Sequence, residues 1–197
     1  MAIQQKFVLM TILAWALTPA LAQTPASTPI VIDAALLAKA NSDDAASQVK
    51  VGDAYAAGSG ADRTTKQLAA DYKLAADWYR KAAEKGNLAG QIHLAELYRD
   101  GKGVPRDPAQ SADWYTKAAQ QGDAGAQGTL GLLYSMGQGV DRNYAEAYFW
   151  LDLAAAVKGP KQAQYAANRQ MVGAHITADE LADVQDRIDK WKSDHPR

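Results

Sequence analysis

The motif Asp-Trp-Tyr-Arg-Lys-Ala-Ala occupies residues 77–83 and recurs at residues 113–119 as Asp-Trp-Tyr-Thr-Lys-Ala-Ala. A third and more divergent copy, Phe-Trp-Leu-Asp-Leu-Ala-Ala, occupies residues 149–155. The tryptophans of successive copies are 36 residues apart. The same period relates Gly-Lys-Gly-Val at 101–104 to Gly-Gln-Gly-Val at 137–140. Self-similarity at one spacing of this size is typical of a solenoid whose units are each too small to bury a core alone.

Each unit is predicted to be a pair of helices joined by a Gly-x-Gly turn. The first helix of the second unit is expected at residues 88–100, where the apolar side chains have helical spacing. The glycines supply the positive-φ backbone that ends this helix and reverses the chain. Asp107, followed by Pro108, then has the pattern of an N-cap with proline at the first helical position, and Asn143 takes the cap role in the next unit. The predicted fold class is all-α, an α-solenoid of helix-turn-helix repeats.

Three repeats flanked by helical caps account for most of the chain. The repeats are expected at residues 45–87, 88–123 and 124–159. The first carries a 7-residue insertion relative to the 36-residue period. Because an insertion of that size is almost two helical turns, it keeps the apolar phase and predicts a lengthened second helix at about 65–85. Capping helices are expected at 33–44 and 160–192, the last of them beginning with a capping box of Thr177 and Glu180.

These motifs resemble those of the Sel-one-like repeat family, a branch of the tetratricopeptide-like α-solenoids. The family combines a Leu-Gly-x-x-Tyr first helix, a Gly-x-Gly-Val turn, and an alanine-rich second helix carrying Trp-Tyr-x-Lys-Ala-Ala before a closing Gly. The second repeat supplies Leu94, Ala95, Tyr98, Gly101, Gly103, Val104, Ala112, Trp114, Tyr115, Lys117, Ala118, Ala119 and Gly122. Departures are mild: Ala95 replaces Gly, Ala61 replaces Val and Leu151 replaces Tyr. The resemblance implies an adaptor or scaffold, and it carries over no catalytic residue because the family motif is structural.

The first 22 residues have the pattern of a secretory signal peptide. Lys6 precedes an apolar run at 7–17, and Ala-Leu-Ala at 20–22 matches a small-residue cleavage site. The run is too short to span a bilayer, which takes about 20 apolar residues. We therefore expect cleavage after this motif, a periplasmic or secreted bacterial chain, and no stable membrane anchor. A disordered linker is expected at 23–32 and a frayed tail at 193–197.

Composition and the scatter of titratable residues exclude several classes of function. A formal net charge of −1 offers no basic surface for nucleic acid, and the absence of cysteine removes disulfides and thiolate metal sites. His93, His175 and His195 form no i, i+3 or i, i+4 histidine pair of the kind that binds metals on a helix. The Gly-x-Gly segments follow helices, so they are interpreted as turns and not as phosphate loops. We expect no cofactor, no metal, no nucleic-acid partner and no catalytic residue.

The first helices are expected to line the concave face, which is the usual binding surface of a solenoid. The recurring tryptophans are in phase with the alanines, so they are assigned mainly to the core between helices. On each first helix, the stripe of residues next to the buried stripe is then expected to face the groove. It consists of Val49, Asp53, Ala56, Ile92, Glu96, Arg99, Gly128, Leu132, Ser135 and Met136. The stripe runs from acidic to apolar and suits a peptide with a basic part and an apolar anchor.

Two functions remain open at this point. The first is a monomeric, periplasmic or secreted protein–protein interaction module that binds an envelope protein or peptide on its concave face. The second is a small-ligand binder or hydrolase acting on peptidoglycan or a β-lactam. The second would require a pocket that shifts the pKa of its carboxyl groups, and no pattern in the sequence predicts one. The binding module is therefore the favoured hypothesis.

Overall fold

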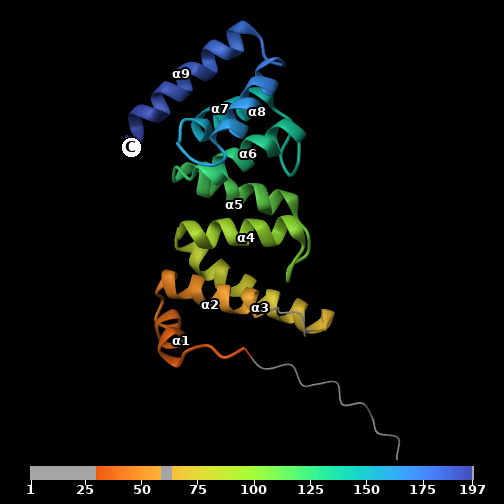
Figure 1. Ribbon diagram of the computed structural model, residues 1–197, viewed down its shortest axis with the longest axis vertical. Coiled ribbons are helices and arrows are strands. Elements are labelled where there is room, and N and C mark those ends of the chain that lie inside the picture. The colour runs from red at the N-terminus through yellow and green to blue at the C-terminus, as the bar shows by residue number, and fades with distance from the viewer. Residues whose placement is uncertain (1–29, 59–63, 197) are drawn as a thin grey trace, which may run out of the picture.

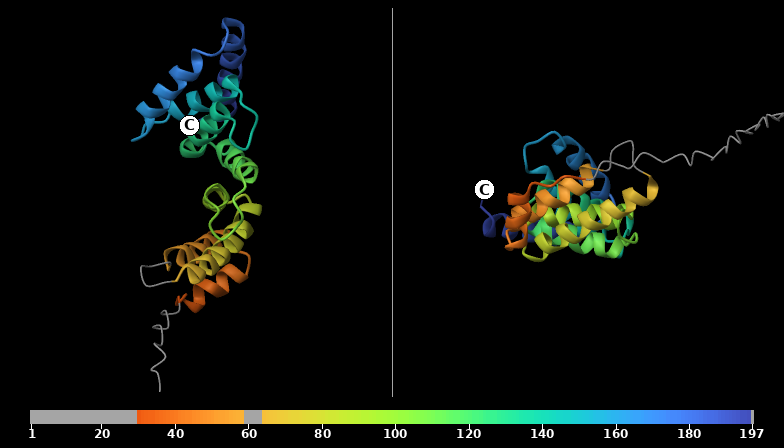
Figure 2. Two further views of the ribbon diagram at one scale, coloured as in Figure 1. Left: turned by 90° about the vertical axis from the view of Figure 1, so that its right-hand side faces the viewer. Right: turned by 90° about the horizontal axis from the view of Figure 1, so that it is seen from below.

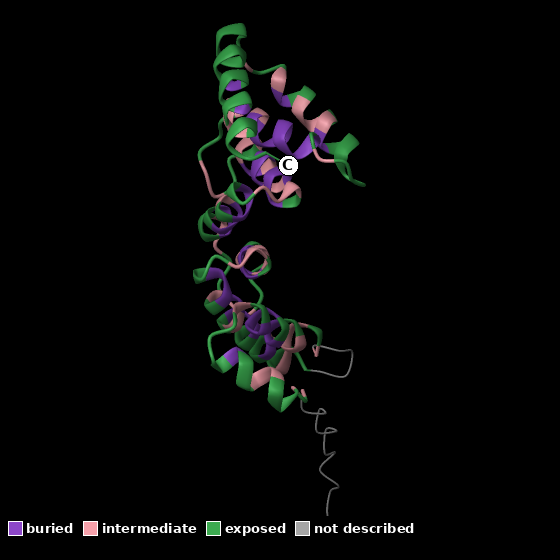
Figure 3. Cartoon of the chain, turned by 90° about the vertical axis from the view of Figure 1, so that its left-hand side faces the viewer, coloured by how far each residue is buried: buried purple, intermediate pink, exposed green. Residues whose placement is uncertain are grey.

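The computed structural model describes residues 30–58 and 64–196. In these two ranges the chain forms nine α-helices and no strand; from α1 to α8 each helix packs against the next, and α9 packs against α7 (Figure 1). The helices are α1 (Ala34–Asn41), α2 (Ala45–Ala57), α3 (Thr65–Glu84), α4 (Leu88–Asp100), α5 (Pro108–Gln120), α6 (Ala124–Met136), α7 (Tyr144–Ala155), α8 (Gln162–Gly173) and α9 (Ala178–Asp194). The stack curves into a crescent (Figures 2 and 3). The predicted α-solenoid is confirmed. The predicted signal peptide, most of the linker and Ala61 lie outside the described residues.

The helices begin where side chains can bind the free N–H groups of the first turn. Asp44, Asn87 and Asp123 cap α2, α4 and α6, and each accepts a hydrogen bond from the backbone N–H three residues on. Asp107 caps α5 with Pro108 at the first helical position, as predicted. A cap of this kind contributes about 1 kcal/mol to helix stability. The first helices of all three repeats therefore start at equivalent positions for a local reason.

In the Gly-x-Gly turns of the second and third repeats, the second glycine is required by two independent constraints. Gly103 and Gly139 have φ angles of 69° and 75°, which L side chains rarely adopt. A Cβ atom on Gly103 would lie 2.2 Å from the carbonyl carbon of Tyr72, and one on Gly139 would lie 2.0 Å from the carbonyl oxygen of Pro108. The turn of one repeat therefore packs directly on the backbone of the second helix of the repeat before it.

The insertion in the first repeat lengthens its second helix. α3 has 20 residues, whereas the equivalent α5 has 13. The difference equals the 7-residue insertion, so the added residues extend the helix at its N-terminal end. Asp71, the last residue of this extension, is buried. The prediction of a longer second helix is confirmed.

The core is built from small and branched apolar side chains at the repeat interfaces. Leu94, Leu130 and Leu153 are fully buried, and burial of one leucine side chain contributes about 1.5–3 kcal/mol. Trp114 and Trp150 are 9% and 7% exposed, as expected for core residues. The sequence also assigns Trp78 to the core, but this residue is only half-buried. The Lys81 ammonium lies 4.0 Å from the ring centroid, an arrangement that Lys117 repeats over Trp114 at 3.7 Å.

A buried glutamine connects each first helix to the end of the preceding helix. The Nε2 atoms of Gln48, Gln91 and Gln127 donate to the carbonyl oxygens of Ala40, Ala83 and Ala119, at 3.1, 3.3 and 3.2 Å. These carbonyls lie in the last turns of α1, α3 and α5, and each also accepts a hydrogen bond from a backbone N–H just beyond. The glutamines therefore add a second hydrogen bond at each of these helix ends and tie it to the next helix.

The C-terminal helices are attached to α7 in two ways. α9 packs on the core through Val184 and Ile188, and its predicted capping box is present at Thr177. Arg169 of α8 and Lys192 of α9 both bind the carboxylate of Asp152, which is only 8% exposed. α9 continues two residues into the segment expected to be a frayed tail, and it ends at Asp194.

Candidate functional site

A cleft of about 370 Å³ opens between α2, α3 and α4. Its aromatic and aliphatic wall comes from α2, α3 and α4, and its charged rim comes from α4 and the turn after it. The residues that line it are Ala56, Tyr72, Tyr79, His93, Glu96, Leu97, Arg99, Asp100 and Lys102. Three of the residues predicted for the groove, Ala56, Glu96 and Arg99, are therefore brought together here.

Four polar side chains from three helices converge at this cleft. The Tyr79 hydroxyl of α3 donates to Oδ1 of Asp53 on α2, at 2.8 Å. Nε2 of His93 on α4 lies 3.7 Å from the same oxygen, and its Nδ1 lies 3.3 Å from Oε2 of Glu96. The His93 ring also packs on the Tyr79 ring, with 4.9 Å between the centroids. Repeats one and two are thus connected through a single imidazole.

The surroundings of this imidazole favour its charged form. The hydrogen bond with Glu96 is the largest influence and raises the pKa of His93 above its usual value, and the Asp53 carboxylate acts in the same direction. Partial burial opposes this rise. Burial also raises the pKa of Tyr79, whose hydroxyl stays protonated as the donor to Asp53. The cluster therefore holds an imidazole whose protonated form is stabilised by two carboxylates.

The rest of the charged rim is internally paired. Nε of Arg99 donates to Oδ1 of Asp100 at 2.8 Å, and Nη1 of Arg99 donates to the Tyr115 hydroxyl at 3.1 Å. Nζ of Lys102 lies 3.4 Å from Oδ2 of Asp100. The hydrogen bond from Arg99 lowers the pKa of Asp100, while burial raises the pKa of Tyr115 to about 12. Asp100 is thereby held ionised between two cations.

The other predicted groove residues lie elsewhere. Val49 is only 7% exposed and belongs to the core, and Gly128 lies under Tyr165, so neither offers a surface to a partner. Ile92 is partly buried against the core. The remaining three, Leu132, Ser135 and Met136, lie on α6 and do not line the cleft; Met136 is 54% exposed.

Two central residues, Tyr79 and His93, were not predicted for the site. The structure shows that His93 contacts the carboxylates of Asp53 and Glu96. The contact between His93 and Glu96 could have been predicted from the sequence, because residues three apart lie on the same face of a helix. Its proximity to Asp53 has no local signal, since that contact joins two repeats.

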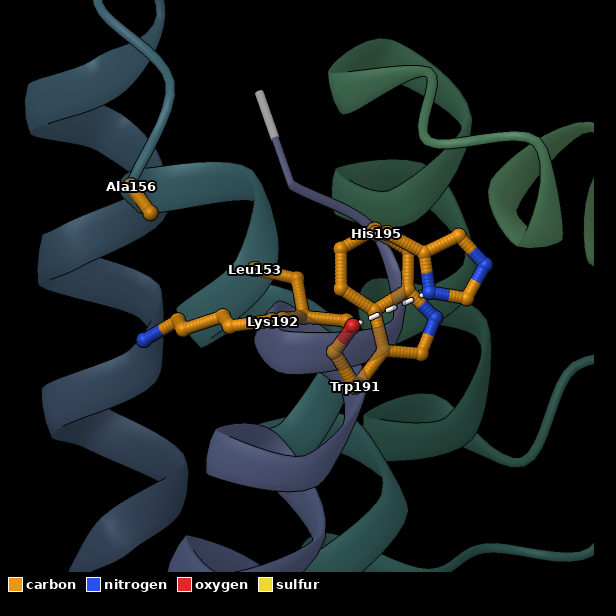
Figure 4. Close-up of a pocket in the computed structure, with 5 residues that line it drawn as sticks. All are labelled: Leu153, Ala156, Trp191, Lys192 and His195. Atoms are coloured by element: carbon orange, nitrogen blue, oxygen red, sulfur yellow. Dashed lines mark hydrogen bonds between the residues drawn. The ribbon is translucent and has the colours of Figure 1, made fainter.

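A second, smaller cavity of about 220 Å³ lies near the C-terminus, beside α7 and α9 (Figure 4). The rings of Trp191 and His195 stack there at 4.2 Å, and Nδ1 of His195 lies 2.9 Å from the Trp191 carbonyl oxygen. Lys192 also lines this cavity but binds Asp152. His195 was expected in a frayed tail, and the stacking instead orders it against the last helix.

Metal ligands do not converge within the described ranges. No group of three or more His, Asp or Glu side chains there is placed to hold a metal ion. None of the helices in these ranges is long and apolar enough to cross a membrane. The carboxyl groups with a shifted pKa, Asp43, Asp44, Asp100 and Glu180, are all shifted downward by hydrogen bonds. A general acid at neutral pH would need the opposite shift.

Solved structures similar to this chain include two that are each 32% identical to it. A protective antigen of uropathogenic Escherichia coli strains, which displays an SLR fold, is 32% identical, with a TM-score of 0.66 over 80% of this chain and 32% of that one. A Sel1 repeat protein from Oxalobacter formigenes is also 32% identical, with a TM-score of 0.56 over 66% of this chain and 92% of that one. This chain therefore spans about a third of the length of the Escherichia coli protein.

Sequence comparison locates the repeats themselves. No curated protein matches the chain. The Sel1 repeat family matches three times, at residues 45–87, 88–123 and 124–156, which together cover more than half of the sequence. With helix pairs, Gly-x-Gly turns and alanine-rich interfaces in each of these ranges, the chain belongs to the Sel1 repeat family.

Proposed function

We propose that this chain is an exported adaptor, periplasmic or secreted, that binds a segment of an envelope protein or peptide in the cleft between α2, α3 and α4. Sel1 repeat proteins are generally protein–protein interaction modules and are typically non-enzymatic scaffolds. The observation that carries the proposal is the cleft itself. Tyr72, Tyr79 and Leu97 provide an apolar and aromatic wall beside ionised groups of both signs. Interfaces combine the same elements, an aromatic core with a polar rim.

The proposed binding surface continues along the first helices toward α6. Met136 is 54% exposed at the end of that helix, and Leu132 lies one turn earlier. An exposed methionine adapts its shape to an apolar side chain of a partner. The surface we propose therefore offers charged groups at the α4 cleft and an apolar contact at α6, in keeping with a segment that has a polar part and an apolar anchor.

Photo-crosslinking in intact cells tests this proposal. Benzoylphenylalanine is placed at Lys102 on the rim of the cleft, at Met136 on α6, and at the exposed Asp186 on α9 as the control. Lys102 and Met136 are expected to yield crosslinks to the same protein, whereas Asp186 yields none. The crosslink at Lys102 should weaken when Glu96 is replaced by Lys. Equal labelling from all three positions, or no protein adduct from Lys102, would refute the proposal.

Export and oligomeric state have separate tests. Mass spectrometry of chain recovered from the periplasm or medium is expected to find Gln23 at its N-terminus, the result of cleavage after Ala22. Retention of all of the protein in the cytoplasm would contradict export. Light scattering of the purified chain is expected to give the mass of a monomer. If the chain instead forms a stable dimer, the proposed surface would be an interface between two copies of the chain.

A further inference from the structure

Glu96 lines the cleft, and Asp53 adjoins it through its contacts with the lining residues Tyr79 and His93. Asp53 and Glu96 have side chains that are 50% and 43% exposed, so both carboxylates are accessible to solvent. The other acid of the rim, Asp100, already contacts the cations Arg99 and Lys102. His93 contacts both carboxylates, and unlike Arg or Lys an imidazole can lose its charge in the physiological pH range.

We propose that the cleft holds a Lys or Arg side chain of the bound segment between the Asp53 and Glu96 carboxylates, and that protonated His93 competes with it for the same two carboxylates. This inference rests on the proposed function, because it specifies the partner that the cleft recognises. The partner chemistry follows from charge complementarity. When His93 is neutral the groups at the cleft carry one more negative than positive charge, and when His93 is protonated the charges balance.

The geometry also suits the stem of a cationic side chain. The rings of Tyr72 and Tyr79 line the cleft beside the carboxylates, and both Lys and Arg place their methylene groups along apolar surface while their charged ends bind acceptors. The Tyr79 hydroxyl donates to Asp53 and holds that carboxylate in place. A guanidinium or ammonium group can then bind the remaining oxygens of Asp53 and Glu96, which an anionic side chain cannot do.

Competition makes the affinity dependent on pH. The groups facing His93 are Asp53 of α2, Tyr79 and Tyr72 of α3, and on its own side of the cleft Glu96, Arg99, Asp100 and Lys102. Burial raises the pKa of Tyr79, and Arg99 lowers the pKa of Asp100. Histidine is the side chain whose ordinary pKa lies between about pH 5 and 8, and the contacts with Glu96 and Asp53 raise the pKa of His93. Affinity for a cation should rise as pH increases through the pKa of His93 and then level off.

The test uses the mature chain and two small probes, N-acetyl-arginine methylamide and N-acetyl-glutamate methylamide. Binding is followed by NMR, and the pKa of His93 is measured from its imidazole signals. We expect the arginine probe to bind, with an affinity that falls about fivefold between pH 8 and 5, at the low end of measured couplings. By linkage, saturating arginine probe should lower the pKa of His93. The glutamate probe should not compete.

Variants separate this inference from the proposed function. Asp53→Asn and Glu96→Gln should each weaken binding of the arginine probe, His93→Gln should remove its pH dependence, and Asp186→Asn on α9 should change neither. Equal affinity for both probes, or binding unaffected by Asp53→Asn and Glu96→Gln, would overturn the inference. If Lys102 crosslinks to a protein while the arginine probe fails to bind, the proposed function stands and this inference falls. If neither is observed, both fall.

Discussion

Asp152 of α7 and Lys192 of α9 form an ion pair across 40 residues of sequence, with 3.0 Å between Oδ2 and Nζ. The other oxygen of the same carboxylate binds Arg169 of α8. One buried acid of the third repeat therefore connects both C-terminal helices to the solenoid. Position 152 corresponds to Arg80 and Thr116 in the earlier repeats, so the acid occurs only in the repeat that is followed by the cap.

Replacing Asp152 with Asn is expected to lower the free energy of unfolding by about 1–3 kcal/mol. The substitution removes the charge that both cations bind, although solvent around Arg169 and Lys192 limits the loss. Urea unfolding followed by circular dichroism measures the change. Asp186→Asn, on the exposed face of α9, is the control and should leave stability unchanged. Equal stability of both variants would show that apolar packing alone holds α9.

Gly139→Ala is expected to destabilise the chain by about 2–4 kcal/mol. The substitution puts a Cβ atom on a residue with left-handed backbone, and this atom overlaps the backbone of α5. The new Cβ would lie 2.0 Å from the Pro108 carbonyl oxygen. Gly159→Ala is a matched control, because a Cβ there meets nothing within 4 Å. Thermal unfolding compares the two variants. If Gly139→Ala unfolds at the wild-type temperature, the turn does not pack on α5 as closely as described.

Gln121→Ala is expected to cost about 1 kcal/mol of unfolding free energy. The Gln121 amide donates to the Gly86 carbonyl oxygen at 3.0 Å and to Oε1 of the buried Gln91 at 2.7 Å. In the described part of the chain the Oε1 atoms of Gln48 and Gln127 have no hydrogen-bond partner. Among these three glutamines, a bond like that of Gln121 therefore forms only at Gln91, between repeats one and two. The neighbouring Gln120→Ala should be neutral in the same urea titration. A loss from Gln120→Ala as large as that from Gln121→Ala would show that the effect does not come from the hydrogen bonds of Gln121.

The His93 cluster should make stability depend on pH. Because the pKa of His93 is raised in the folded chain, its contribution is fully present below the unfolded value of about 6.5. It is lost as pH rises through the higher folded value. The change should be at most about 1 kcal/mol, since the side chain is 38% exposed and solvent screens the pairs.

Urea unfolding between about pH 5 and 8 compares the wild-type chain with His93→Gln. The wild-type chain should lose its advantage as pH rises, and the profile of His93→Gln should lack that component. An advantage that grows with pH would mean that burial, which lowers the pKa of a histidine, outweighs the two carboxylates.

The positions of most helices were predictable because their causes are local. Asp107 before Pro108, the Thr177 capping box and the glycines of the turns act within a few residues of themselves. The 36-residue period then places equivalent helices in each repeat. The length of α3 followed from helical phase alone. These features needed no knowledge of how the helices cross.

The candidate site was only partly predictable, because it depends on how helices of different repeats face one another. Periodicity identifies the stripe of a helix that is buried, but not which neighbouring stripe turns toward the next repeat. Val49 was assigned to the groove and is buried, whereas Tyr79 was assigned no role there and binds Asp53. The rotation of each helix depends on close contacts between helices, such as Gly52 against the Tyr79 ring, where a Cβ would lie 2.6 Å from the ring.

The sequence by itself determined that the chain is an α-helical repeat protein, with its turns, caps and repeat lengths, because a fixed period and local capping chemistry specify them. Only the tertiary structure decided that Asp53 and His93 meet at one cleft and that Asp152 joins both C-terminal helices. The paired residues are 40 residues apart in Asp53–His93 and Asp152–Lys192, and 17 residues apart in Asp152–Arg169. They lie on helices whose separation and rotation are set by side-chain packing. That packing is a property of the assembled stack, and no single repeat encodes it.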